Sequence, residues 1–432
     1  CLSRGLNVAG YDRTSTPLTD ALRREHADII FEDNPGLIPM SFRDPQTTLV
    51  VYTPAVGDDN AILSMFRREG FEIVKRARLL GRLTADGHAI CVAGSHGKTT
   101  TSSMIANILR LTDKGCNAFL GGILRNIDSN LILSDRTDIS VVEADEYDRS
   151  FHQLTPYIAV ITSNDPDHLD IYGDEEHYIE AFSIFSSLIK PDGYLIMHTG
   201  LKMQPACDPS VKIYTYSGGA EGDFHAEDIR YGEGVITFTL IGPDGLRIEN
   251  MSPGVPVEIN VDNAVAAAAA ALLAGATPDE VREGLRTFRG AKRRFEIYLT
   301  EPIVLIDDYA HSPNEVRASI RSVRKLYPGR RLSVIFQPHL YTRTRDFAPE
   351  FAEALSEADE VIMPEIYPAR EQPIEGVDSM LILNAVTSPV KRFCEQKDLV
   401  NLIKNSNFEI LMTLGAADID KILPDVVDIY VS

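Results

Sequence analysis

The residues with the clearest chemical potential form one short stretch, Gly94-Ser95-His96-Gly97-Lys98-Thr99-Thr100. An apolar run, AICVAG, precedes it, and a helical pattern, SSMIANIL, follows it. Glycines let backbone N–H groups approach a phosphate, a helix N-terminus adds partial positive charge, and Lys98 and Thr99 could reach phosphate oxygens and Mg²⁺. The strict loop G-x-x-x-x-G-K-[ST] requires glycine where this sequence has Val92. The alternative is an ordinary strand-to-helix turn, but the order of strand, turn and helix favours a phosphate loop.

Acidic residues and one histidine follow two other apolar runs of strand length. The segment VVEADEYDRS supplies Glu143, Asp145, Glu146 and Asp148, and the segment SNDPDHLDIYG supplies His168 between several aspartates. Ligands bind at the carboxyl ends of parallel strands, and hard cations prefer oxygen ligands. The two segments therefore predict a metal-phosphate site, against the alternatives of a solvated acidic loop and a structural histidine.

Basic residues and further histidines gather in the last third of the chain. In FRGAKRRFE, Arg293 and Arg294 could stabilise a transferring phosphoryl group, because negative charge spreads over its oxygens. The alternative is a cluster of interdomain salt bridges. Other candidates follow apolar runs: Asp308 and His311 in DDYAHSPNE, and His339, Arg343 and Arg345 in FQPHLYTRTRD, a candidate carboxylate-binding cluster.

The elements that must position these residues alternate between strand and helix. Apolar runs such as ISVVEAD, YIAVIT and YLIMH are separated by helical patterns such as HYIEAFSIFSSLI, which predicts an α/β fold with a parallel sheet. The stretch VITFTLIGPDGLRIE predicts a hairpin, and an alanine-rich run after Asn263 predicts a buried helix. Thr277 and Glu280 have the spacing of a capping box. After FRGAKRRFEIY the pattern restarts, which predicts a further α/β domain.

The first stretch indicates half of a mononucleotide-binding unit. GLNVAGYDR predicts a short strand ending in Asp12, and TLVVYTPAV predicts another strand. In such folds a glycine-rich turn precedes the acidic residue by about 20 positions. Only eleven residues precede Asp12. Either Asp12 is incidental, or the first strand and its glycine-rich loop lie before Cys1.

Composition and charge exclude several classes of protein. The chain has 432 residues and a net charge of −21, which argues against a nucleic-acid surface because phosphate contacts need clustered Lys and Arg. Five widely spaced cysteines without a CxxC pair predict a reducing cytoplasm. The longest apolar run is shorter than the roughly 20 residues of a membrane helix.

Taken together, the motifs resemble those of the Mur ligase family. Eight segments occur in that family's order along nearly the whole chain: GSHGKTTT, VVEADE, DPDHLD, NVDNAVAA, FRGAKRRFE, DDYAHSPNE, FQPHLYTRT and IYPAREQPIEGVDS. The resemblance implies an ATP-dependent ligase of peptidoglycan synthesis. The last two segments are most similar to members that join L-alanine to the carboxylate of UDP-N-acetylmuramate through an acyl phosphate.

The resemblance also implies a three-domain α/β architecture. An N-terminal Rossmann-like, UDP-sugar-binding domain is expected over 1–86, without its first strand and glycine-rich loop. A central P-loop ATP-binding domain is expected over 87–292. A C-terminal Rossmann-like domain that binds the amino acid and closes over ATP is expected over 293–432.

Roles for individual residues follow from the same resemblance. The loop from Gly94 to Thr100 is expected to bind ATP, together with two asparagines and an aspartate: Asn260, Asn263 and Asp308. Mg²⁺, or alternatively Mn²⁺, is expected on Thr99, Glu143 and His168. Lys98, Glu143, His168, Arg294 and Asp308 are expected to be catalytic, and His339, Arg343 and Asp12 to contact substrates.

Four positions depart from the family pattern, and two other functions remain open. Ile259 stands where the family has a histidine before Asn260, and Leu340 stands where it has an arginine after His339. Ser312 replaces a second histidine in DDYAHSPNE, and Ala417 replaces a glycine in LGAAD. One alternative is a sister ligase that attaches a recycled tripeptide to the same sugar nucleotide. The other is a P-loop ATPase or switch that forms no peptide bond and hydrolyses ATP without an amino acid.

Overall fold

We describe the fold from a computed structural model of the chain. The structure describes residues 1–53, 56–57, 59–166, 169–232, 234–369 and 371–431. The chain divides into two compact units, Cys1–Asp86 and Gly87–Ser432, and each is described by itself.

The first unit is built on two pairs of short parallel strands, β1 with β2 and β3 with β4. Its core contains Ile62, Met65, Phe66 and Phe71. The predicted strands in GLNVAGYDR and TLVVYTPAV are confirmed as β1 and β3. The elements are β1 (Ala9–Tyr11), α1 (Pro17–Arg24), β2 (Asp28–Ile30), β3 (Leu49–Tyr52), α2 (Ala61–Arg68), β4 (Glu72–Lys75) and α3 (Arg76–Thr84).

The second unit begins with a ten-stranded sheet in the order β14-β13-β12-β11-β10-β9-β5-β8-β6-β7. Strands from β12 to β6 in that order run parallel, whereas β7, β13 and β14 are antiparallel to their neighbours. The strands are β5 (His88–Ala93), β6 (Asn117–Leu124), β7 (Ser129–Ile132), β8 (Ile139–Glu143), β9 (Ile158–Ile161), β10 (Tyr194–His198), β11 (Lys212–Ser217), β12 (Phe224–Gly232), β13 (Val235–Ile241) and β14 (Arg247–Met251).

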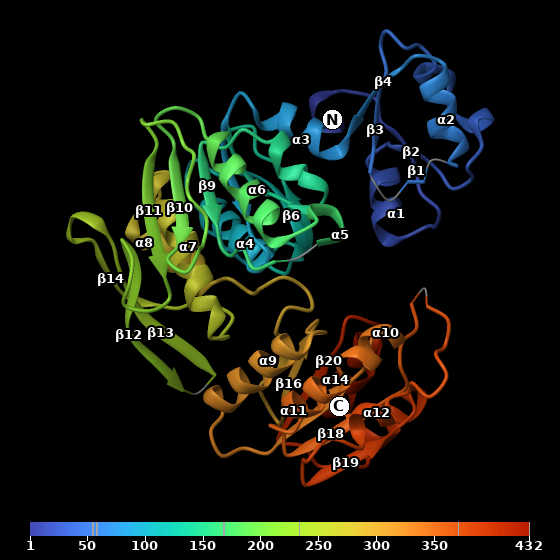
Figure 1. The fold of residues 1–432 in the computed structure, drawn as a ribbon, viewed down its shortest axis with the longest axis vertical. Coiled ribbons are helices and arrows are strands. Elements are labelled where there is room, and N and C mark those ends of the chain that lie inside the picture. Colours follow the sequence, from blue (N-terminus) through green and yellow to red (C-terminus); the bar gives the residue numbers. More distant parts are fainter. Residues whose placement is uncertain (54–55, 58, 167–168, 233, 370, 432) are drawn as a thin grey trace. The chain divides into compact units, whose positions relative to one another are not determined.

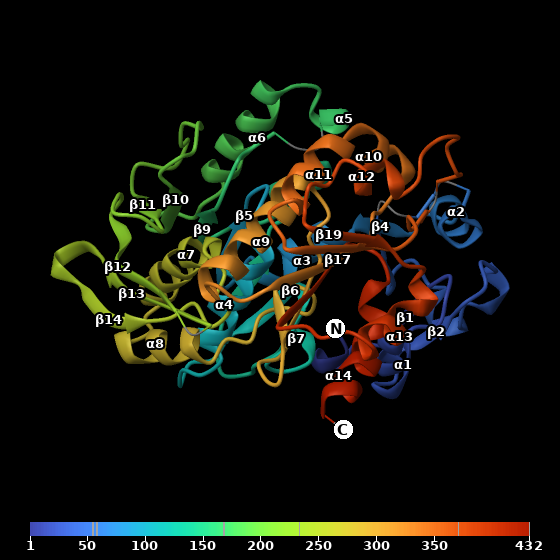
Figure 2. The ribbon, with the colours of Figure 1, turned by 90° about the horizontal axis from the view of Figure 1, so that it is seen from below.

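Helices α4, α7 and α8 pack against one another beside this sheet, as Figure 2 shows. The alanine-rich run forms α7, and its alanines are fully buried, as predicted. Thr277 caps α8 through the predicted capping box with Glu280. The helices are α4 (Lys98–Leu109), α5 (Leu169–Tyr172), α6 (Glu175–Ser187), α7 (Ile259–Leu273) and α8 (Pro278–Arg286). Among the described residues, every helix is too short or too polar to cross a membrane.

A six-stranded sheet in the order β15-β16-β20-β17-β18-β19 follows, drawn in orange to red in Figure 1. Neighbouring strands of this sheet run parallel, except that β15 is antiparallel to β16. The strands are β15 (Glu296–Leu299), β16 (Val304–Asp308), β17 (Leu332–Phe336), β18 (Glu360–Met363), β19 (Val390–Phe393) and β20 (Ile410–Leu414). The helices are α9 (Pro313–Leu326), α10 (Tyr341–Asp346), α11 (Ala348–Leu355), α12 (Met380–Leu383), α13 (Leu399–Lys404) and α14 (Leu423–Val431).

The strands of this second sheet are apolar on both faces because helices cover both. Ile306 and Val334 belong to the cluster that includes α9 and α11, whereas Leu305 and Ile335 belong to the cluster that includes α13 and α14. Neighbouring strand residues point to opposite faces, so continuous apolar runs are typical of such buried parallel strands.

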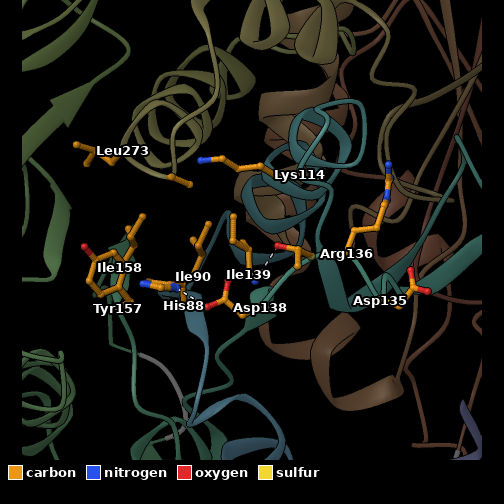
Figure 3. Close-up of a pocket in the computed structure, with 12 residues that line it drawn as sticks. His88, Ile90, Lys114, Asp135, Arg136, Asp138, Ile139, Tyr157, Ile158 and Leu273 are labelled. Carbon is orange, nitrogen blue, oxygen red and sulfur yellow. Dashed lines mark hydrogen bonds and ion pairs between the residues drawn. The ribbon is translucent and has the colours of Figure 1, made fainter. Parts of the chain in front are cut away.

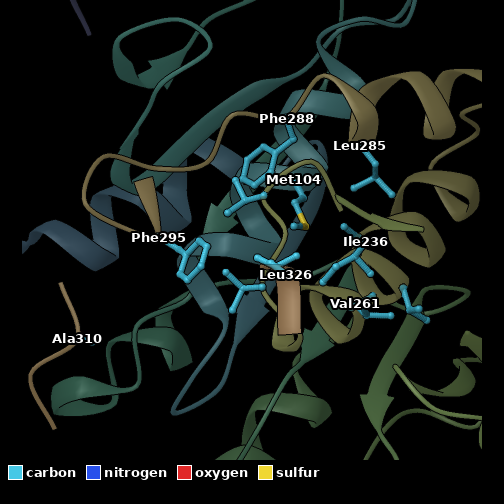
Figure 4. Close-up of a cluster of buried hydrophobic side chains, with 14 of the residues drawn as sticks. Met104, Ile236, Val261, Leu285, Phe288, Phe295, Ala310 and Leu326 are labelled. Carbon is cyan, nitrogen blue, oxygen red and sulfur yellow. The ribbon is translucent and has the colours of Figure 1, made fainter. Parts of the chain in front are cut away.

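The larger hydrophobic cluster of the second unit joins side chains from both sheets and their helices. Figure 4 shows Met104 and Leu285 in the same cluster as Phe295 and Leu326. The core of the second unit is therefore continuous between the two sheets, and it includes Phe295, which follows the basic segment FRGAKRR.

The predicted alternation of strands and helices is confirmed, but the sheet edges differ from a purely parallel sheet. The predicted hairpin is confirmed as β13 and β14, which form one edge, while β6 and β7 at the other edge were not predicted. Gly121 and Gly122 interrupt the alternation within β6, which weakens the signal for a strand. The segment LTADGH contains the end of α3 and the boundary between the two units.

Candidate active site

The strand β5 and the helix α4 flank the phosphate loop, as predicted, and α4 begins at Lys98. Gly94 and Gly97 have positive φ angles of 142° and 82°. A Cβ atom added to Gly94 would lie 2.1 Å from Thr162 Oγ1 and 2.8 Å from Ser163 N, so only glycine fits there. The first turn of α4 carries no acidic residue. Its partial positive charge therefore has no acidic partner within that turn.

The segment after β9 holds the loop through side-chain hydrogen bonds. Ser163 Oγ accepts from the backbone N–H of His96 at 2.7 Å, and Thr162 Oγ1 donates to the carbonyl of His96. Ser95 Oγ donates to the carbonyl of Asp165 at 2.6 Å. Thr162 and Ser163 were not predicted, although their place directly after a strand was a usable signal.

The ammonium group of Lys98 lies over its own loop. Its Nζ donates to the carbonyl of Gly94 at 2.5 Å and lies 2.8 Å and 2.7 Å from the two carboxylate oxygens of Glu146. Glu146 is 1% exposed, and this burial raises the pKa of its carboxyl group, while Lys98 opposes the rise. The sequence identified Glu146 only as one of several acids, and its pairing with Lys98 comes from the structure.

Thr99 and Glu143 form a pair of oxygen donors beside Lys98. Thr99 Oγ1 donates to Glu143 Oε1 at 2.9 Å, and Glu143 Oε2 accepts from the N–H of Gly121 at 2.9 Å. Hydroxyl and carboxylate oxygens are ligands that hard cations prefer, so this pair fits the predicted Mg²⁺ site. The third predicted ligand, His168, lies outside the described residues. Within the described part of the chain, no group of three or more His, Cys, Asp and Glu side chains could hold a metal ion.

Asn260 and Asn263 lie buried beneath the loop. Asn263 Oδ1 accepts from Thr101 Oγ1 at 3.1 Å, and Asn263 Nδ2 donates to Asn260 Oδ1 at 3.0 Å. A Cβ atom added to Gly97 would lie 2.7 Å from Asn263 Oδ1. The two asparagines therefore support the loop itself, and their direct contact with a nucleotide stays a prediction.

We expect Asn263→Ala to lower the free energy of unfolding by about 1–3 kcal/mol, because buried groups of Thr101 and Asn260 each lose a partner. Urea unfolding followed by circular dichroism measures this change. Asn384→Ala is the matched control, since that side chain is exposed and makes no hydrogen bond with the rest of the described chain. The control should stay within about 0.5 kcal/mol of the parent. Equal effects of the two variants would contradict the supporting role of Asn263.

Arg293 and Arg294 were both expected at a transferring phosphoryl group, but their surroundings differ. The guanidinium of Arg293 donates to the carbonyl of Gly415 at 2.6 Å and pairs with Asp307 at 3.2 Å. Arg294 is exposed, and its guanidinium carbon lies 5.4 Å from the ring centre of Tyr309. Because the donors of Arg293 are occupied by Asp307 and by carbonyl groups after β20, Arg294 is the more available of the two, and its role at a phosphoryl group stays a prediction.

Asp308 ends β16 and is only 8% exposed. Its carboxylate accepts from the N–H of Phe295 at 3.3 Å and from the hydroxyl of Ser319. Burial raises the pKa of this carboxyl group, which these hydrogen bonds and the charge of Arg294 oppose. The predicted contact of Asp308 with ATP stays a prediction.

His339 and Arg343, predicted to bind the amino acid, lie close together after β17. The ring of His339 stacks on Tyr367 with centroids 6.0 Å apart, and its buried Nδ1 has no partner within the described chain. Burial and the positive charge of Arg343 lower the pKa of His339. Leu340, where the family has an arginine, adopts a positive φ of 69°.

We expect His339 to remain neutral until the pH falls below about 6.5, the ordinary pKa of histidine. His177 should behave oppositely, because its hydrogen bond with Asp174, at 2.8 Å, raises its pKa. Because the folded chain resists protonation of His339, that residue's contribution to stability falls as the pH drops through the unfolded-state pKa. Proton NMR titration measures both midpoints, with signals assigned through His339→Gln and His177→Gln. A higher midpoint for His339 than for His177 would contradict the expectation.

Two further predicted residues, Thr100 and Asp12, belong to different units. Thr100 lies in the first turn of α4. Asp12 belongs to the first unit, where it is exposed after β1 and accepts from the N–H of Thr14 at 3.1 Å. Tyr178 was not predicted, and its hydroxyl lies 2.9 Å from Ser95 Oγ. Nothing in the helical pattern around Tyr178 pointed to the loop.

A cavity of about 660 Å³ lies elsewhere, at the opposite ends of the same strands. Figure 3 shows His88, Asp138 and Tyr157 around it, with Lys114 and Arg136. No predicted site residue lines this cavity. Ligands of open α/β sheets bind at the carboxyl ends of the strands, so we place the candidate active site at the phosphate loop rather than at the cavity.

The fold and the loop define a P-loop α/β protein, and comparison with known proteins defines its family. Three family profiles match: "Mur ligase family, catalytic domain" over residues 1–88, "Mur ligase middle domain" over 92–271, and "Mur ligase, glutamate ligase domain" over 293–411. The chain belongs to the Mur ligase family.

Named relatives match along nearly the whole chain. A UDP-N-acetylmuramate–L-alanine ligase of Parabacteroides distasonis is 52% identical over 99% of this chain and 93% of its own. The enzyme of the same name from Porphyromonas gingivalis is 48% identical over 98% and 93%. A crystal structure of UDP-N-acetylmuramate-alanine ligase MurC from Thermotoga maritima has a TM-score of 0.79 at 27% identity, covering 99% of this chain and 94% of that one.

Proposed function

We propose that this chain is an ATP-dependent ligase that joins L-alanine to the carboxylate of UDP-N-acetylmuramate in peptidoglycan synthesis. The observation that carries the proposal is the loop that places Lys98 beside Thr99 and Glu143 at the start of α4. Curated relatives at 52% and 48% identity, which carry the name of this activity, support it. The sister ligase and the ATPase remain as outcomes of the test below.

We assign the three parts of the reaction to three domains. Residues 1–86 would bind the UDP-sugar, with Asp12 at the end of β1. Residues 87–292 would bind ATP, and residues 293–432 would bind alanine through His339 and Arg343. The hydrophobic cluster that these last two domains share supports a close mechanical link between them.

In the first step, an oxygen of the muramyl carboxylate attacks the γ-phosphorus of ATP, and ADP leaves. The β- and γ-phosphates would lie on the N–H groups of the loop and the ammonium of Lys98, which neutralise the charge that develops. Mg²⁺ would be held by Thr99 and Glu143, with His168 as a third candidate, and would supply further charge neutralisation. Arg294 is the exposed cation that would complete this environment.

In the second step, the amine of alanine attacks the acyl carbon, and inorganic phosphate leaves as the amide forms. His339 and Arg343 would orient the alanine carboxylate, and the neutral state of His339 near pH 7 leaves it able to accept a proton. Asp308, at the end of β16, would contact the nucleotide from the C-terminal domain. Exclusion of water during this step would protect the acyl phosphate from hydrolysis.

A cytoplasmic location is part of the proposal. All five cysteines are free thiols, which agrees with a reducing compartment.

The test is release of inorganic phosphate from Mg-ATP, with UDP-N-acetylmuramate and L-alanine supplied together, singly or not at all. We expect release only when both are present, with one amide product per phosphate by mass spectrometry. Release with a tripeptide in place of alanine would favour the recycling ligase. Release that is indifferent to both substrates would favour the ATPase and overturn the proposal.

A further inference from the structure

The ammonium of Lys98 is fully engaged with neighbouring groups of the chain. It contacts the carbonyl of Gly94 and both oxygens of Glu146, and the side chain is only 15% exposed. Apart from Lys98, no donor in the described part of the chain serves Glu146 Oε2. Each charge of this pair is therefore the main partner of the other.

A phosphate group that enters the loop must compete for this ammonium. The carboxylate of Glu146 and the phosphate oxygens carry the same sign of charge, so they repel each other when both approach Lys98. Separation of a buried ion pair leaves one charge without compensation, which is unfavourable. Binding of a nucleotide therefore has to overcome the attraction between Lys98 and Glu146.

The structure indicates which partner moves. The hydroxyl of Tyr172 donates to the backbone carbonyl of Glu146. Glu146 itself lies between β8 and a short helical turn at Tyr147–Gln153. Glu146 is thus anchored at its backbone and buried. Lys98 has four rotatable methylene groups and greater exposure, so its ammonium can swing from Glu146 toward a phosphate.

We propose that Glu146 is a positioning residue that holds Lys98 away from the phosphate position until ATP binds. The inference rests on the proposed function, because it requires ATP at this loop. It assigns to Glu146 a role different from the metal binding predicted for Glu143. A polyphosphate must therefore attract the ammonium of Lys98 more strongly than Glu146 does before it can bind that group.

The test compares the affinity for nucleotide of the Glu146→Gln variant with that of the parent protein, both full-length, by isothermal titration calorimetry. Glutamine keeps the shape and removes the charge. We expect the dissociation constant of ATP to fall by about ten- to a hundredfold, the worth of a charged hydrogen bond. The dissociation constant of AMP should not change, because AMP lacks the β- and γ-phosphates that Lys98 would contact.

Asp145→Asn is the matched control. It removes the same charge one residue away, but Asp145 is exposed and accepts from the backbone N–H of Tyr147 instead of binding Lys98. Its effect on ATP affinity should be at least fivefold smaller than that of Glu146→Gln. In a Lys98→Ala background, Glu146→Gln should tighten ATP binding no more than Asp145→Asn does.

The outcomes separate this inference from the proposed function. If the parent binds no ATP, the proposed function fails and this inference with it. If the parent binds ATP but Glu146→Gln binds it no more tightly than Asp145→Asn, only this inference is overturned. If Glu146→Gln loses its thermal unfolding transition, Glu146→Asp takes its place. That variant withdraws the carboxylate by one methylene and should also tighten ATP binding, and its failure to do so would overturn the inference.

Discussion

Lys98→Ala should lower the rate of substrate-dependent phosphate release by about a hundred- to a thousandfold, the usual effect of removing one preorganised charge from a transition state. Lys98 begins α4 within the glycine loop and is the side chain placed to neutralise phosphate oxygens there. Its loss leaves the helix N-terminus and the loop N–H groups, which cannot replace a full positive charge. The measurement is phosphate release with both substrates at saturation.

Lys202→Ala is the control for this variant. Lys202 is an exposed lysine of the same unit, and its only ion pair in the described chain is with Glu175 at 2.9 Å. Surface pairs of this kind contribute little, so the rate should be unchanged. Because Lys98→Ala also leaves Glu146 buried without a cation, its fold is checked by circular dichroism. A folded Lys98→Ala variant with at least half of the parent rate would contradict the assignment of the phosphate loop.

Gly94→Ala should abolish nucleotide binding and lower the melting temperature. The φ of 142° strains any residue with a Cβ atom by about 1–3 kcal/mol, and the added Cβ would also collide with Thr162 Oγ1. Relief of the collision requires the loop to separate from the segment that holds His96 in place. Differential scanning calorimetry measures the loss of stability, and calorimetric titration measures ATP binding.

Gly329→Ala separates strain from collision. Gly329 has a φ of 80°, and an added Cβ there would meet nothing within 4 Å. This variant should lose only about 1–2 kcal/mol and keep its affinity for ATP. If Gly94→Ala and Gly329→Ala bind ATP equally well, the close contact between Gly94 and Thr162 has no functional importance.

The family, the α/β fold and the order of strand, loop and helix at the phosphate loop were predictable, and they are confirmed. Local spacing carries this information, because a glycine turn between an apolar strand and a helix can be recognised within about 19 residues of sequence. The resemblance to the family placed Thr99 and Glu143 at one site, and in the structure they form a hydrogen bond where β5 and the neighbouring parallel strand β8 end.

Contacts between distant segments were much harder to predict. Nothing in the sequence near Arg293 indicates that carbonyl groups of Gly415 and Ala417 will occupy its guanidinium. In the same way, only the folded chain shows that Asn263, from α7, lies against Gly97. Both cases depend on the register in which remote elements pack, and one sequence does not encode that register locally.

The run of alanines in α7 affects how the residues at the phosphate loop are positioned. Methyl groups such as that of Ala268 are completely buried, and small side chains allow α7 and α4 to approach closely. The two helices start at the same end of the sheet, where α4 supplies Lys98 and α7 supplies Asn263. A bulky substitution deep in this interface would therefore tilt one helix start against the other. Packing deep in the core therefore bears on the position of Lys98 and Asn263 as well as on stability.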